Sequence, residues 1–168
     1  MNRLPRSALP FVLLASLAHA EHPQSLGARV GDAAFESGDA EITFIATRGA
    51  FTLSASTRGA SAWPPPKTRV DRLSIVCDGF VDGQPLRLDH AAFSRSTCSV
   101  VFDRGNKPMG GAPDASFHID KASTDNRFEI TAANGKVYTG TFSFVLVDDA
   151  GATLRIAEGH FEAEDRQL

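Results

Sequence analysis

Few residues in this 168-residue chain combine the types and the spacing that chemistry requires. His118 and Asp120 lie two residues apart, and Glu158, His160 and Glu162 alternate in the same way. Residues two apart share one face of a strand, so either group could offer nitrogen and oxygen ligands to a divalent ion. The same pattern is typical of a solvated strand face. We favour that interpretation and predict no metal site and no cofactor.

Motifs for covalent or hydrolytic catalysis are missing as well. The sequence has no G-x-S-x-G nucleophile elbow, no S-x-x-K and no H-E-x-x-H. Paired carboxylates for glycoside hydrolysis need only meet in space, so no spacing rule excludes them. The aspartates that could serve look like turn or outward-facing residues: Asp78, Asp82, Asp89 and Asp103. We therefore predict no catalytic residue and a function other than an enzyme.

The only two cysteines, Cys77 and Cys98, are predicted to form a structural disulfide. Closing a loop of about 22 residues would stabilise the fold by about 3 kcal/mol. A redox role would favour C-x-x-C spacing, which the chain lacks.

Residues 1–20 read as a secretory signal peptide. Two arginines precede an apolar run, Ala8–Ala18, and an A-x-A cleavage site ends at Ala20. The run is too short to span a bilayer, and nothing later is long enough. We expect a periplasmic or secreted protein without a membrane span.

The charge balance argues against nucleic acid and anionic membranes as partners. Without the predicted signal peptide, 15 basic side chains face 20 acidic ones, a net charge of −5. No basic run stands out from this mildly acidic background.

The elements that must position any site are strands, most clearly in the last third of the chain. Residues 127–163 alternate apolar and polar residues through three runs, which predicts an antiparallel meander. The middle run should turn one face to the core: Tyr138, Gly140, Phe142, Phe144 and Leu146.

Loop lengths set the expected registers of this meander. A three-residue loop ending at Gly135 would place Ile130 opposite Tyr138 and Phe128 opposite Gly140. A similar loop ending at Gly151 would place Leu154 opposite Leu146 and Ile156 opposite Phe144. The alternation of apolar and polar residues then shifts by one position at Glu158-Gly159. This shift predicts a bulge there and brings Phe161 near Gly140.

The rest of the chain reads as further hairpins in one domain, residues 39–168. Residues 21–38 look like a lead-in segment with a short strand near Phe35. We predict hairpins over 40–57 and 70–93, the second around an Asp82-Gly83 turn with Cys77 opposite Leu88. Shorter strands follow at 99–103 and 115–121, separated by a glycine-rich loop at 104–114.

About eight to ten short strands with short connections indicate an all-β antiparallel meander. Such a meander closes into a barrel or folds into a sandwich, and we favour the barrel. No oligomeric state is predicted.

The stretch Tyr138-Thr139-Gly140-Thr141-Phe142-Ser143-Phe144, with Ile156, Gly159 and Phe161 in the next strand, resembles the closing hairpin of small exported bacterial β-proteins of uncharacterised, calycin-like families. The resemblance covers residues 138–161. It implies a fold and a compartment and no catalytic residue.

Two functions remain open from the sequence. The favoured one is a barrel that binds a small apolar or amphipathic ligand, with Tyr138, Gly140, Phe142, Phe144 and Trp63 as ligand-binding residues. The alternative is a protein-interaction module, such as an inhibitor or adaptor of an exported or envelope protein, that uses Trp63 and the loop 104–114. Trp63 stands directly before three prolines. We favour its ring as a lid over one end of the sheet rather than as a surface anchor.

Overall fold

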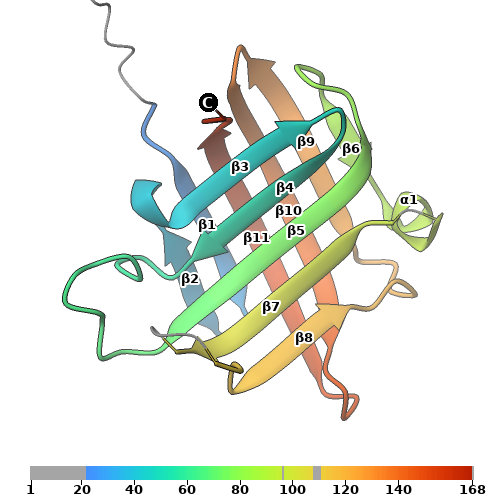
Figure 1. The fold of residues 1–168 in the computed structure, drawn as a ribbon. Helices are drawn as coiled ribbons and strands as arrows, with labels where there is room; N and C mark the ends of the chain where they lie inside the picture. The colour runs from blue at the N-terminus through green and yellow to red at the C-terminus, as the bar shows by residue number, and fades with distance from the viewer. Residues whose placement is uncertain (1–21, 96, 108–110, 168) are drawn as a thin grey trace, which may run out of the picture.

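The computed structural model describes residues 22–95, 97–107 and 111–167. The predicted signal peptide lies outside these residues. The described chain is all-β, as predicted, and builds one antiparallel sheet that curls into a nearly closed barrel (Figure 1). Its strands are β1 (Ser25–Val30), β2 (Ala33–Ser37), β3 (Ile42–Thr47), β4 (Gly49–Ser56), β5 (Val70–Phe80), β6 (Leu86–Leu88), β7 (Ser99–Asn106), β8 (Ala115–Ile119), β9 (Arg127–Asn134), β10 (Val137–Val147) and β11 (Thr153–Glu164). A 3-10 turn, η1 (Asp39–Glu41), and one helix, α1 (His90–Arg95), interrupt them.

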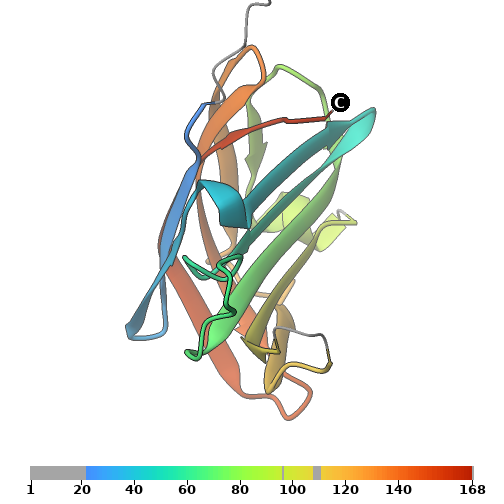
Figure 2. The same cartoon turned by 60° about the vertical axis from the view of Figure 1, so that its left-hand side comes forward.

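Neighbouring strands follow the order β2-β1-β11-β10-β8-β7-β5-β4-β3, and β9 joins β10 to β6. In Figures 1 and 2, β3, β4, β5, β7 and β8 form a layer that crosses over β1, β9, β10 and β11. The expected barrel is thus confirmed in preference to a sandwich. Within the described ranges, no helix is long and apolar enough to cross a membrane.

Aromatic rings fill the space between the two layers. The inward residues of β10 are buried, as the alternation predicted. Tyr138 stacks on Phe44 with 4.6 Å between ring centroids, and Phe51 stacks on Phe128 at 5.0 Å. Each such pair adds roughly 0.5–1.5 kcal/mol to the stability gained from burial. The core of the barrel is therefore a packed aromatic cluster.

The barrel closes along a seam between β3 and the end of β11. Phe44 of β3 forms a parallel bridge with Asp165, directly after β11. Gln24 lies between these strands and is 5% exposed. Its amide nitrogen donates to the Ile42 carbonyl at 3.2 Å, and its amide oxygen accepts from the Glu164 N–H at 2.9 Å. A side chain thus satisfies backbone groups that a continuous strand ladder would otherwise pair.

A second break in the ladder lies along β10. This strand pairs with β9 over its first part and with β8 only at its last two residues. Asn126, which is fully buried, occupies the fork between them. Its amide nitrogen donates to the Asp120 carbonyl at 2.7 Å, and its amide oxygen accepts from the Val145 N–H at 2.9 Å. The side-chain amide of Asn126 therefore pairs with one backbone acceptor, the Asp120 carbonyl, and one backbone donor, the Val145 N–H, which have no strand partner at the fork.

Most of the predicted registers are confirmed. The hairpin predicted over 40–57 is β3–β4, in which the apolar residues that alternate along the two strands face each other, Ile42 with Ala55 and Phe44 with Leu53. The β10–β11 hairpin and the bulge beside Gly159 also have the predicted pairs, which are Leu146 with Leu154, Phe144 with Ile156 and Gly140 with Phe161.

The predicted loop between β9 and β10 is wrong. Asn134 pairs with Val137 across a tighter turn, in which Gly135 has φ 62°. A bulge at Thr131 then adds one residue to β9 and returns the apolar side chains to the inner face. The alternation gave no sign of this bulge because small and polar residues surround it. The observed pairs are Ile130 with Gly140 and Phe128 with Phe142.

The predicted hairpin over 70–93 is also wrong, so Cys77 does not face Leu88. Strand β5 pairs with β4 and β7, whereas β6 pairs with β9 and residues 90–95 form α1. The turn at Asp82-Gly83 exists, but the Tyr138 hydroxyl donates to the Asp82 carboxylate and accepts from the Gly83 N–H at 3.2 Å. This contact directs the chain toward β9 and β10, away from β5.

The predicted disulfide between Cys77 and Cys98 is confirmed. It closes the stretch of chain between Cys77 and Cys98, which contains β6 and α1, and both cysteines are buried. Phe93 of α1 is fully buried and meets the Phe144 ring edge-on at 5.8 Å between centroids. The helix therefore packs into the same aromatic core as the strands.

Two segments contain more strand than predicted. Residues 21–38 include the expected strand around Phe35, which is β2, but also β1, which pairs with β11. Residues 104–106 belong to β7 and not to the predicted loop. The short apolar runs of these segments did not reveal their partners, which are distant in sequence.

Replacing the fork amide should destabilise the barrel. We expect Asn126→Ala to lower the free energy of unfolding by about 2–4 kcal/mol, because the buried Val145 N–H and the partly buried Asp120 carbonyl lose their partner. Urea denaturation measures this loss. The control Asn134→Ala, at an exposed turn position, should stay within about 0.5 kcal/mol of the parent. Equal stability of the two variants would contradict the role of Asn126.

Candidate functional site

The most exposed large apolar side chain of the described residues is Trp63, at 88%. It lies in the loop 57–69 between β4 and β5, which we call the Trp63 loop and which projects from the barrel in Figure 1. The prediction that this ring covers one end of the sheet is therefore wrong. The three prolines of the loop cannot donate backbone hydrogen bonds to a strand, so the loop cannot join the sheet. The interior of the barrel is already occupied by phenylalanine rings, which leave the Trp63 ring outside.

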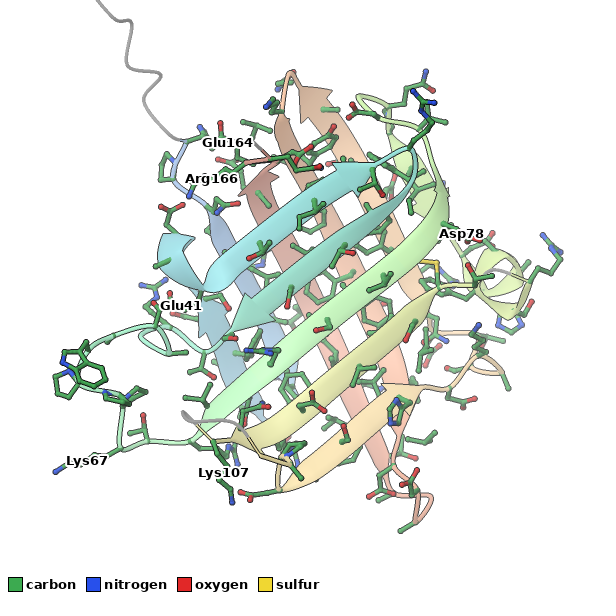
Figure 3. All side chains as sticks on the ribbon, viewed as in Figure 1. Glu41, Lys67, Asp78, Lys107, Glu164 and Arg166 are labelled. Atoms are coloured by element: carbon green, nitrogen blue, oxygen red, sulfur yellow. A yellow bond between two sulfur atoms is a disulfide. The ribbon has the colours of Figure 1, made fainter. Side chains whose placement is uncertain are left out.

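Glu41 fastens the first half of the Trp63 loop. One of its carboxylate oxygens accepts from the Gly59 N–H at 3.1 Å and from the Ser61 hydroxyl at 2.6 Å. Burial raises the pKa of Glu41, but the hydrogen bonds from Ser61 and from the backbone outweigh it and hold the pKa below its usual value. The ionised carboxylate therefore keeps the turn before Trp63 in place (Figure 3).

Thr57 and Asp71 tie the two ends of the loop together. The Thr57 N–H donates to the Asp71 carbonyl at 3.0 Å, and the Asp71 N–H donates to the Thr57 hydroxyl at 2.9 Å. Asp71 is buried, with 8% of the residue exposed, and its carboxylate accepts a hydrogen bond from the Gly105 N–H at 3.0 Å. It also forms an ion pair with Arg69 at 3.0 Å. The loop thus has a fixed root and an exposed tip.

Two neighbouring hollows lie at the root of the loop. One has a volume of about 270 Å³ and reaches from Glu41 and Ser61 to Arg72. The other, of about 120 Å³, continues from Arg72 to Lys107. We call them together the root groove. They share three lining residues, which are Ser56, Ala60 and Arg72.

The predicted ligand-wall residues of β10 come together, but as packed groups. Phe142 stacks on Phe144 at 5.6 Å between centroids. Gly140 is covered, because an added Cβ would lie 2.1 Å from the Glu129 carbonyl oxygen and 2.6 Å from the Phe161 ring. Five hollows in the described structure are lined without any of Tyr138, Gly140, Phe142 and Phe144.

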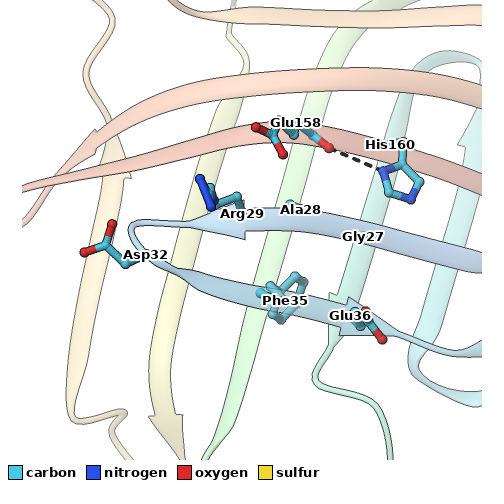
Figure 4. A pocket seen from close by; sticks show the side chains of 9 residues that line it. Gly27, Ala28, Arg29, Asp32, Phe35, Glu36, Glu158 and His160 are labelled. Carbon is cyan, nitrogen blue, oxygen red and sulfur yellow. Dashed lines mark hydrogen bonds between the residues drawn. The ribbon is translucent and has the colours of Figure 1, made fainter.

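The two histidine and carboxylate groupings are separate. Asp120 accepts the Ala122 N–H in a turn at the end of β8. Glu158 sits in the β11 bulge with φ 55°, whereas Glu162 pairs with His22. His160 lines a hollow of about 330 Å³ on the outer face of β1, β2 and β11 (Figure 4). Among the described residues, no group of three or more His, Cys, Asp or Glu is arranged to hold a metal ion.

Sequence reasoning missed the residues that hold the Trp63 loop. Glu41 and Asp71 are acidic residues beside strands, and their hydrogen-bond partners in and around the loop lie 14 to 34 positions away. The only local signal was the absence of any acidic residue between Thr57 and Val70, which leaves the loop to be fastened from outside.

Removing the carboxylate of Glu41 should loosen the loop. We expect Glu41→Ala to lower the free energy of unfolding by about 1–2 kcal/mol and to reduce the fluorescence anisotropy of Trp63. Trp63 is the only tryptophan, so the signal reports on the loop alone. The control Glu36→Ala removes only an exposed ion pair with Arg58 at 3.7 Å and should leave both quantities nearly unchanged. An unchanged anisotropy in Glu41→Ala would refute this role.

Tyr138 should titrate at unusually high pH. Burial, followed by the hydrogen bond to Asp82, raises the pKa of Tyr138 from 10.0 to about 12. The folded state holds the Tyr138 proton more tightly than the unfolded chain does, and this difference stabilises the fold. The stabilisation is complete below pH 10 and is lost as the pH rises toward 12. The loss should total about 2–3 kcal/mol. Tyr138→Phe should flatten the fall of stability in this range.

Tyrosinate absorbance measures that pKa directly, because Tyr138 is the only tyrosine. The urea-unfolded chain is the internal reference and should titrate near the ordinary value of about 10. A folded-state midpoint equal to that of the unfolded chain would contradict the buried contact with Asp82.

Comparison with family models, with curated proteins and with solved structures finds no match for this chain.

Proposed function

We propose that this protein is an exported interaction module that binds another protein through the Trp63 loop. The observation that carries the proposal is the 88% exposure of Trp63 on a loop whose root is fixed. An isolated exposed apolar residue is common, but an exposed tryptophan next to three prolines on a fastened loop is not an ordinary surface feature.

The energetics of burial favour such a role. A tryptophan buries about 200 Å² in an interface, which at about 25 cal/mol/Å² corresponds to a gross gain of about 5 kcal/mol. Ordering costs reduce the net gain in any association. Because Glu41, Thr57 and Asp71 already restrain the loop, less conformational entropy remains to be lost on binding.

Two other features support the compartment of this proposal. The disulfide between Cys77 and Cys98 is typical of an oxidising environment. Together with the signal peptide predicted for residues 1–20, it supports a periplasmic or secreted location. The partner would then be an exported or envelope protein, with this chain acting as its inhibitor or adaptor.

The second candidate is a carrier of a small apolar ligand, with which the nearly closed barrel is compatible. Barrels of this size can hold one small molecule. A carrier would need an interior space of at least about 300 Å³. The stacked rings of Phe44, Tyr138, Phe51 and Phe128 occupy the middle of the interior, so this candidate requires them to move apart.

Native mass spectrometry of the protein purified from its own compartment separates the two candidates. We expect a stoichiometric protein complex that Trp63→Ala weakens at least about 30-fold, the effect of losing a central tryptophan anchor. The control Val81→Ala removes another exposed apolar side chain, 57% exposed, and should retain the complex. A complex that survives Trp63→Ala, or a bound mass of a few hundred daltons instead of a protein, would overturn the proposal.

A further inference from the structure

We propose that the Trp63 loop fits an acidic protein, one whose carboxylates surround an apolar pocket for the Trp63 ring. This step rests on the proposed function above and names the class of partner. It follows from the charges on the loop and in the root groove.

The loop is basic although the chain as a whole is acidic. Its basic side chains are Arg58, Lys67 and Arg69, and no acidic residue lies between Thr57 and Val70. The net charge of the full chain is −3. The apolar tip of the loop is therefore flanked by positive charge on both sides in sequence.

Part of this charge has no partner within the protein. Lys67 is exposed and has no hydrogen bond or ion pair with another described residue. Arg58 pairs with Glu36 only at 3.7 Å, where both side chains are more than half exposed. Exposed pairs of this kind contribute little and exchange readily for other carboxylates.

The root groove adds two more cations below the loop. Arg72 lies where the two hollows of the groove join, and the one hydrogen bond of its side chain in the described structure is to the Ser56 hydroxyl at 3.4 Å. Lys107 lines the far end and pairs with the exposed Asp114 at 3.2 Å. Figure 3 shows Lys67 and Lys107 on the same side of the barrel.

The groove also contains one acidic residue, Glu41, whose ionised carboxylate offsets one of these cations. Glu41 uses one carboxylate oxygen to hold the Gly59 N–H and the Ser61 hydroxyl, which are neutral donors and leave its charge in place. A partner approaching the groove meets two cations against this one carboxylate, the guanidinium of Arg72 and the ammonium of Lys107. Cations at the tip and at the root bracket an apolar centre, which is the layout of an interface with an anchor and a charged rim.

Carboxylates on the partner would steer its approach and fix the orientation of the loop. Such steering acts on the association rate and weakens as salt screens the charges over about 8 Å at physiological ionic strength. The Trp63 ring would then determine how slowly the complex dissociates.

Poly-L-glutamate is a defined probe for this surface, and Trp63 fluorescence reports its binding. We expect binding at low salt that weakens about tenfold in Lys67→Glu/Arg72→Glu. The matched control Arg87→Glu/Lys136→Glu reverses two exposed basic residues away from the loop and should retain the affinity. Equal losses in both double variants, or tighter binding of poly-L-lysine or of an oligothymidylate, would overturn the acidic-protein proposal.

The protein complex expected in the native mass spectrometry experiment provides the second arm of the test. If Trp63→Ala dissolves that complex but Lys67→Glu/Arg72→Glu and added salt leave its association rate unchanged, the interaction module stands and the acidic partner is refuted. A Trp63-dependent complex of two copies of this chain would also refute a foreign acidic partner. If no complex depends on Trp63, the proposed function itself fails.

Discussion

The constraint on which the rest of the structure depends is the seam that Gln24 closes between β3 and β11. Its amide nitrogen also donates to the Asp39 carbonyl at 3.3 Å, and Arg166 contacts the Asp39 carboxylate at 2.7 Å. These contacts hold η1 against the barrel, and η1 contains Glu41. Because Glu41 in turn holds the Trp63 loop, closure of the barrel and presentation of the tryptophan belong to one chain of contacts. The Arg166 hydrogen bond lowers the pKa of Asp39, so the Asp39 carboxylate stays ionised to lower pH than an ordinary aspartate.

Side-chain amides recur wherever the backbone ladder is interrupted. Gln24 serves the seam and Asn126 the fork, and each offers a donor and an acceptor to strands that cannot reach each other. A carboxylate could not donate and an ammonium could not accept, so an amide is the natural side chain for such positions. The barrel can therefore change strand partners along β10 without leaving buried backbone groups unsatisfied.

The strand content, the disulfide and the inward face of β10 could be predicted from alternation and cysteine count, because these patterns are local. The pairing of β6 with β9 could not, since it depends on the contact of Tyr138 with Asp82, 56 positions away. Trp63 was recognised as a candidate, but its direction depends on Glu41 and Asp71. Neither residue carries a local signal. Bulges such as that at Thr131 escaped notice because small neighbours conceal the change of phase.

The seam also constrains when the fold can form. The hydrogen bond between Gln24 and the Glu164 N–H joins residues 140 positions apart, and β1 must pair with β11. Long-range contacts of this kind are formed late and slow the folding of β-proteins. A chain emerging from a ribosome or a membrane channel cannot close this barrel until residue 164 has passed. The edge of β1 that faces away from β2 remains without a partner until then, so the emergence of β11 decides when the barrel can close.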